Sequence, residues 1–438
     1  MKLTYKAISP GKLFVSTWVF VHIAAFLGPK EAVYSRYKVI NETFTMSGSL
    51  WVGASLLAFG AGIWLANQKL LLISHPYQSD QYQNENMDSL NTWALSAAVK
   101  PISSFAISIV LLLAYWTLLA IAEVGSFSSF IETMYQNWHK VRNLWPNQKP
   151  FTGARLLYTG LISIVIFAAS GLGVIKSQPH SNLRAYGLKK SHIWLGILSL
   201  GLIPLMLLPL LVSQRILLAT AIVGGVSTYT VVNDQGIPLK YPVIGGFLGM
   251  VVWTSQEVIR VGFSTETIIE SIRYGLSRLL LYFTNDIGNL HRGIKYASDY
   301  SYGAESFSFV LRYLFISEEI KRGYLQSFYL NLSKYKGGGG FTGLGSPYLD
   351  FGIFGLILVL IWGYTAQVLY LRSKYSILSA QIYGLVAASI VLSWHLALLA
   401  NPLFWLNIAI LIFMMAWVPS IEIWLLQYLD LVENNDID

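Results

Sequence analysis

The 438-residue chain contains no cysteine and few charged residues. Without cysteine the chain cannot form disulfides, Cys-ligated zinc sites, iron–sulfur clusters or thiol nucleophiles, so any catalysis must use arginine, histidine, carboxylates or hydroxyls. Charged residues make up 12% of the chain, about half the share of a soluble domain, and hydrophobic residues make up 54%. The composition therefore predicts an all-α, polytopic integral membrane protein.

Membrane spans need about 20 mostly apolar residues, because lipid forces each helix to satisfy its own backbone polar groups. Ten stretches qualify or nearly qualify: about 13–28, 48–66, 99–121, 154–175, 192–212, 216–232, 242–259, 347–371, 379–397 and 402–424. We therefore expect about ten transmembrane helices, within a range of nine to twelve. No internal repeat of fixed period is present.

The positive-inside rule sets the orientation of these spans. With the N-terminus in the cytoplasm, twelve Lys and Arg residues of short loops lie inside and seven outside. The sequence then divides into an N-terminal bundle of about seven spans (1–259), a large extracytoplasmic loop (260–346), C-terminal transmembrane helices (347–424) and an acidic cytoplasmic tail (425–438). The polar segment 67–92 is expected to be a cytoplasmic connector.

A formal net charge of +8 is compatible with nucleic acid, anionic lipid or an anionic substrate, and the hydropathy argues against nucleic acid. Six of the arginines lie in the large loop. Between Thr265 and Phe283 apolar residues recur at helical spacing, which predicts an amphipathic helix with Arg273 and Arg278 on its more polar side. A weaker helical pattern covers about 305–333.

A glycine-rich run, Gly337-Gly338-Gly339-Gly340-Phe341-Thr342-Gly343-Leu344-Gly345, ends the large loop. Successive backbone N–H groups in such a run can bind an anion. The alternative is a flexible hinge before the next span, and the run taken alone favours the hinge.

Four features together resemble one family of membrane proteins. They are Ser9-Pro10-Gly11 before a span that carries Trp18, the turn Ser213-Gln214-Arg215 between two spans, the long basic loop, and the glycine-rich run that leads into Phe351-Gly352-Ile353-Phe354-Gly355. This layout resembles the Wzy-type bacterial oligosaccharide repeat-unit polymerases of the O-antigen polymerase and ligase superfamily. The ligases carry a His near the end of the large loop, and its absence from 343–350 favours a polymerase.

The resemblance implies a glycosyltransferase that transfers a growing glycan from a polyprenyl diphosphate, such as undecaprenyl diphosphate, to a sugar hydroxyl of the next lipid-linked unit. The product would be a surface polysaccharide: the O-antigen of lipopolysaccharide, a capsule or an exopolysaccharide. The resemblance places the protein in the bacterial cytoplasmic membrane with its active site outside. It implies a lipid-linked donor and acceptor, membrane lipids, a chain-length regulator and a flippase as partners, and no cofactor.

A diphosphate leaving group needs positive charge, which paired guanidinium groups supply without a metal. No carboxylate cluster has the spacing of a metal site, so we expect a metal-independent reaction. The candidate catalytic residues are Arg215, Arg278, His291 as the general base, and Asp286. The candidate substrate-binding residues are Arg260, Arg273, Arg292 and Tyr274.

Each candidate has a structural alternative. Arg215 lies in a very short turn between two spans, where it equally fits an arginine that extends to lipid headgroups. His291 alternatively is an exposed loop histidine, and His395 is expected to be a packed residue of a span. Two other functions stay open: a ligase that transfers the finished glycan, and a transporter or flippase of lipid-linked oligosaccharide, although a transporter would hold its charges within the spans.

Overall fold

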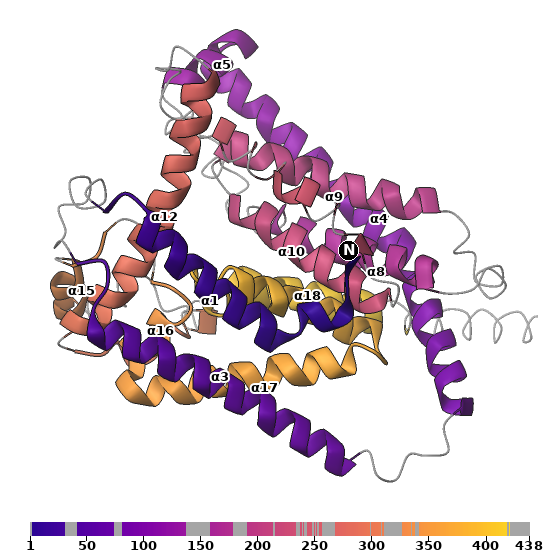
Figure 1. The fold of residues 1–438 in the computed structure, drawn as a ribbon. Helices are drawn as coiled ribbons and strands as arrows, with labels where there is room; N and C mark the ends of the chain where they lie inside the picture. Colours follow the sequence, from indigo (N-terminus) through magenta and orange to yellow (C-terminus); the bar gives the residue numbers. More distant parts are fainter. Residues whose placement is uncertain are drawn as a thin grey trace, which may run out of the picture.

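The fold is almost entirely helical (Figure 1). The computed structural model describes residues 2–30, 42–73, 81–136, 158–177, 191–212, 215–233, 268–297, 299–307, 326–333, 335–337 and 341–417, together with 309–310, 420 and short pieces between 237 and 255. The long helices are α1 (Pro10–Leu27), α3 (Met46–Ile73), α4 (Gln81–Val124), α8 (Leu161–Ser177), α9 (Ser191–Val212), α10 (Arg215–Val232), α12 (Ile268–Tyr296), α17 (Gly355–Arg372) and α18 (Ile377–Val391).

Shorter elements join these helices. They are η1 (Tyr5–Ile8), α5 (Phe127–Gln136), α15 (Gln326–Ser333), α16 (Gly345–Phe351), η3 (Gly352–Phe354), η4 (Leu398–Ala400), α19 (Pro402–Ile412) and η5 (Phe413–Trp417). Two short strands, β1 (Lys2–Leu3) and β2 (Ile237–Pro238), pair antiparallel, with Lys2 opposite Pro238.

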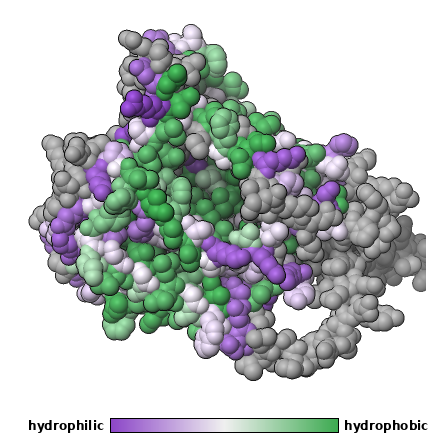
Figure 2. Space-filling model, in the orientation of Figure 1, coloured by the Kyte–Doolittle hydropathy of each residue, from purple (hydrophilic) through white to green (hydrophobic). Residues whose placement is uncertain are grey.

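Within the described residues, five helices are long and apolar enough to cross a membrane: Pro10–Leu27, Met46–Gln68, Leu95–Val124, Arg215–Val232 and Gly345–Arg372. Shorter apolar helices cover 161–177, 191–207, 377–391 and 402–417. Large apolar side chains such as Phe20, Leu57 and Ile357 are exposed, and apolar residues cover much of the face in Figure 2, as expected of a surface in contact with lipid. The expectation of an almost entirely helical chain with several helices able to span a membrane is thus confirmed.

Two of the expected segments differ in the structure. The polar segment 67–92 is not simply a connector, because α3 continues to Ile73 and α4 already begins at Gln81; extending a helix by one residue costs little once it has formed. The span expected at 379–397 is helical only to Val391. Half of the stretch at 242–259 and all of the tail at 425–438 lie outside the described residues, and the count of ten spans stays a prediction.

Small residues allow two helix pairs to approach closely. In the pair α3 and α17, a Cβ at Gly62 would overlap the carbonyl oxygen of Leu360, and a Cβ at Gly363 would overlap that of Phe59. Where α10 packs on α18, a Cβ at Gly384 would overlap Thr228. Close backbone approach through small residues is how helices associate in lipid, where burial of apolar side chains gives no advantage.

Helix α12 connects the two ends of the molecule. In Figure 1 the N-terminal end of α12 lies in the region of α5, and its C-terminal end lies beside α15 and α16. The C-terminal half packs against α1 and α3. Ile269, Ile272 and Leu276 near its N-terminus are exposed, whereas residues 281 and 283–294 are buried. The C-terminal half of α12 therefore lies inside the protein, next to the candidate site.

The contact of α3 with α17 can be tested by adding one side chain. We expect Gly62→Leu to lower the stability of the purified protein by roughly 1–3 kcal/mol or more, because the new side chain meets the α17 backbone. Gly53→Leu is the control on the same helix, since a Cβ there has no neighbour within 4 Å. Thermal unfolding in detergent measures both, and an equal Tm for the two variants would contradict this packing.

Candidate functional site

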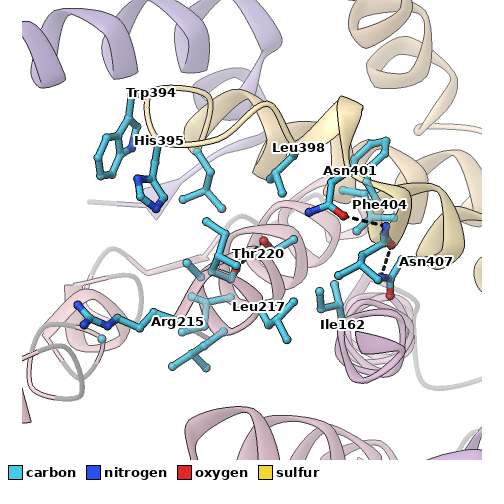
Figure 3. Close-up of a pocket in the computed structure, with 18 of the residues that line it drawn as sticks. Ile162, Arg215, Leu217, Thr220, Trp394, His395, Leu398, Asn401, Phe404 and Asn407 are labelled. Atoms are coloured by element: carbon cyan, nitrogen blue, oxygen red, sulfur yellow. Dashed lines mark hydrogen bonds between the residues drawn. The ribbon is translucent and has the colours of Figure 1, made fainter. Parts of the chain in front are cut away.

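A cavity of about 450 Å³ lies between α8, α10, α18, α19 and the segment 392–401 (Figure 3). Tyr282 of α12 also lines it. Arg215 and His395 lie at one end of it, and Asn401 and Asn407 at the other. Most other lining residues are apolar: Ile162, Ile216, Leu217, Leu218, Ala219, Ile222, Leu385, Leu392, Trp394, Leu398, Leu403 and Phe404. The cavity thus combines one cationic end with mostly apolar walls.

Arg215 is the first residue of α10, so its guanidinium group and the positive end of the helix dipole lie at the same place. Its Cζ lies 5.9 Å from the ring centroid of Tyr282, within the range of a cation–π contact. The Tyr282 ring also contacts His395 edge to face, with 6.0 Å between ring centroids. Tyr282 therefore lies between the two polar groups of this end of the cavity.

His395 forms a hydrogen-bonded pair with Asp286, although the two residues are 109 positions apart in the sequence. The distance from His395 Nδ1 to Asp286 Oδ2 is 2.6 Å, and Asn285 Nδ2 donates to the other Asp286 oxygen at 3.1 Å. The Asp286 side chain is 1% exposed and the His395 side chain 29%. Asp286 is therefore buried behind a histidine that reaches the cavity.

The electrostatics of this pair favour a proton on His395. Burial alone would lower the pKa of His395, but the hydrogen bond and the charge of Asp286 outweigh it and hold that pKa above its ordinary value. The charge of Arg215 acts in the opposite direction. Because Nδ1 donates to Asp286, Nε2 is the nitrogen that takes up and releases the proton.

The buried half of α12 also binds the start of the glycine-rich run. Asn289 Oδ1 accepts from the backbone N–H of Gly337 at 2.7 Å. A Cβ at position 337 would overlap Asn285 Oδ1, so the approach requires glycine there. Gly337 thus allows the backbone of the run to approach α12 closely. Gly338, Gly339 and Gly340 lie outside the described residues, so neither expectation for the run as a whole is tested.

Arg292 is fully buried and binds three parts of the chain. Its Nε donates to the carbonyl of Tyr335 at 2.7 Å, Nη1 to that of Glu42 at 2.9 Å, and Nη2 to Asn289 Oδ1 at 3.0 Å. It does not line the cavity. Arg292 was predicted to bind substrate. In the structure it joins α12 to the segments around 42 and 335.

His291 is fully buried on α12 and does not line the cavity. The backbone N–H of Thr45 donates to its Nδ1 at 3.0 Å, and its ring packs against Phe44 and His22 at centroid distances of 5.3 and 5.8 Å. Burial, together with the neighbouring His22 and Arg292, lowers the pKa of His291 to about 4 and keeps it neutral at physiological pH. The expected alternative of an exposed loop histidine is wrong for this position.

The other candidates lie elsewhere. Arg273 is exposed on the N-terminal half of α12, and Tyr274 and Arg278 are half-buried there; none of the three lines the cavity. Arg260 lies outside the described residues. Of the candidate catalytic residues, the structure brings Arg215 and Asp286 to the same region. In the described part of the chain, no group of three or more His, Cys, Asp or Glu residues is placed to hold a metal ion.

Sequence reasoning missed His395 and Tyr282 as residues of this cavity. An ionisable residue in a strongly apolar stretch was the available signal for His395, but its partner on a distant helix was not evident from the sequence. No protein-family model matches the chain, and comparisons with curated proteins and with solved structures found no match.

The structural role of Arg292 gives a direct test. We expect Arg292→Met to lower the stability by about 2 kcal/mol or more, because it leaves the part-buried carbonyls of Tyr335 and Glu42 and the buried Asn289 side chain without their donor. Arg273→Met is the matched control on the same helix, where an exposed side chain should change stability by less than about 0.5 kcal/mol. Thermal unfolding of the detergent-solubilised variants compares them, and equal effects would rule out the structural role.

Proposed function

We propose that the protein is a membrane glycosyltransferase that polymerises polyprenyl-diphosphate-linked oligosaccharide units into a surface polysaccharide. The observation that carries the proposal is the cavity with Arg215 and the Asp286-supported His395 at one end, mostly apolar walls, and two asparagines at the other end. A lipid diphosphate has two parts that match this cavity: an anionic head for the cationic end and a hydrocarbon chain for the apolar walls. The polymerase resemblance and the apolar helices agree with this assignment.

The polar end of the cavity supplies the groups that the reaction needs. A guanidinium carries a permanent charge and binds phosphate oxygens through two parallel hydrogen bonds, so Arg215 stabilises the departing diphosphate. His395, oriented by Asp286, is the general base. We assign this role to His395 in place of His291, because His395 lines the cavity and His291 does not.

In the proposed reaction, the acceptor hydroxyl oxygen attacks the anomeric carbon of the donor sugar. The bond from that carbon to the diphosphate oxygen breaks, and its electron pair leaves with the lipid diphosphate beside Arg215. The hydroxyl proton passes to Nε2 of His395, while Nδ1 keeps its hydrogen bond to Asp286. No metal is required in this scheme.

The remaining parts of the proposal follow the resemblance. The enzyme lies in the bacterial cytoplasmic membrane, with this cavity open towards the exterior, and it works with a flippase and a chain-length regulator. Arg278, Arg273 and Tyr274, on the N-terminal half of α12, are proposed to contact the glycan or the diphosphate as the substrate enters.

An assay of the purified protein tests the proposal. The substrate is a synthetic polyprenyl-diphosphate repeat unit, EDTA is present, and a gel resolves the glycan ladder. We expect Arg215→Ala and His395→Ala each to lower the rate by about 100-fold or more, since each removes one transition-state contact. Arg372→Ala and His192→Ala, both at exposed positions, are the matched controls.

Two outcomes would contradict the proposal. If the controls lose as much activity as Arg215→Ala and His395→Ala, the cavity is not the active site. If the wild-type protein forms no ladder but moves lipid-linked saccharide across the bilayer of proteoliposomes, the transporter alternative is correct.

The pH dependence of the rate tests the role of Asp286. A general base must be deprotonated, so the wild-type rate should rise with pH through a pKa above the ordinary value of His395, 6.5. Asp286→Asn removes the charge that raises this pKa, so the rising limb should move to lower pH while the maximal rate falls. Initial rates between pH 5 and 9 measure both effects, and an unmoved limb would exclude the pair as the titrating group.

A further inference from the structure

A second cavity, of about 500 Å³, lies on the other side of the segment that carries His395. It runs between α17, α18 and α19, and along α17 it is lined from Leu358 to Leu369. At the rise of an α-helix the eleven steps from Leu358 to Leu369 correspond to about 16 Å, so the cavity is elongated along the helix. Its shape suits a chain better than a compact ligand.

The two cavities share a wall. Leu398 and Phe404 line both, and the segment before them alternates between the two sides. His395 lines the first cavity, whereas Ser393 and Leu396 line the second. Two ligands bound at the same time would therefore lie side by side, with His395 in the partition between them.

The chemistry of the second cavity differs from that of the first. The described residues that line it include no Lys, Arg, Asp or Glu. Its polar side-chain groups are hydroxyls and the indoles of Trp362 and Trp405, and both Ser306 Oγ and Trp362 Nε1 are buried without a hydrogen-bond partner. Such a cavity fits the hydrocarbon part of a ligand, but its described lining offers no charge with which to stabilise a departing diphosphate.

One end of the second cavity adjoins a turn that presents aromatic rings. Asp350 fixes this turn by accepting from the backbone N–H groups of Glu305 at 3.0 Å and Ser306 at 2.6 Å. Tyr300 and Tyr302 in the turn are 40% and 74% exposed, and Tyr302 has a positive φ of 48°. A strained and exposed tyrosine in a fixed turn is typical of a binding surface, and a tyrosine ring offers a flat apolar face with a polar tip.

We propose that the second cavity binds the hydrocarbon chain of the acceptor, a second lipid-linked saccharide whose sugars lie on the turn with Tyr300 and Tyr302. This inference rests on the proposed function, in which donor and acceptor are both lipid-linked and the donor diphosphate binds beside Arg215. The acceptor hydroxyl then reaches His395 from the side opposite the donor. The acceptor diphosphate does not leave, so its site needs no catalytic cation.

A kinetic experiment separates the two substrates. The donor is a repeat unit whose acceptor hydroxyl is blocked, and the acceptor is a unit joined to its lipid by a non-cleavable phosphonate, so each molecule has one role. Thr365→Trp fills the second cavity from an exposed position of α17, and Ile357→Trp is the matched control on the same helix outside the cavity. We expect Thr365→Trp to raise the KM for the acceptor by roughly tenfold or more, leaving the KM for the donor unchanged.

Shortening the acceptor lipid should raise the wild-type KM for the acceptor and have little effect in Thr365→Trp. If Thr365→Trp changes the donor KM instead, or changes neither KM, the inference is wrong. If the wild-type protein does not join the donor and acceptor units into a product of two repeat units, the proposed function itself is contradicted.

A binding experiment tests the second cavity independently of activity. A polyprenyl diphosphate saccharide with a diazirine on its chain is photolysed with the protein in phosphatidylglycerol vesicles, and the labelled peptides are identified. We expect label on 358–369 and 382–399, reduced in Thr365→Trp and by excess lipid-linked saccharide. Label that phosphatidylglycerol removes equally well would identify an ordinary lipid site and overturn the inference.

Discussion

A row of polar side chains on the C-terminal half of α12 is buried inside an otherwise apolar helical protein. Asn285, Asp286, Asn289 and Arg292 lie on neighbouring turns of this helix and are 3% exposed or less. A buried polar group without a partner is costly, and Asp286, Asn289 and Arg292 each hydrogen-bond to another part of the chain. The segments that carry these partners are therefore held next to α12, and they surround the candidate site.

Each partner fixes one side of the site. Arg292 holds the segments around 42 and 335, and Asn289 holds Gly337 at the start of the glycine-rich run. Asp286 binds His395, which brings the segment after α18 next to α12 and sets His395 between two cavities of unlike character. One cavity has a cationic end, and the described lining of the other includes no Lys or Arg; the proposed reaction, in which one of two lipid-linked substrates loses its diphosphate, uses this difference.

Much of the helical architecture could be predicted from the sequence, because long apolar runs have few alternatives to a membrane span. The amphipathic start of α12 was also recognisable, since Ile268, Ile272 and Leu279 recur at helical spacing. Its continuation to Tyr296 was not, because a stretch with Asn285, Asp286 and Asn289 resembles a polar loop when its partners are unknown. The partners of Asn289 and Asp286 lie 48 and 109 positions away, a distance that no local pattern reports.

The candidate site was predictable only in part, for the same reason. Arg215 drew attention as a charge between two spans, and Asp286 as a carboxylate in the large loop. His395 looked like a packed span residue, because neither the end of α18 at Val391 nor the approach of α12 is encoded near it. Local patterns identified the charged residues, and tertiary contacts decided which of them meet.

The most direct test of the account is a structure of the protein with a polyprenyl diphosphate bound. We expect the diphosphate within hydrogen-bond distance of Arg215 and near His395, with the hydrocarbon chain along Leu217 and Phe404 between α10 and α19. A diphosphate bound elsewhere, for example at Arg273 alone on the N-terminal half of α12, with the first cavity filled by other lipid, would contradict it.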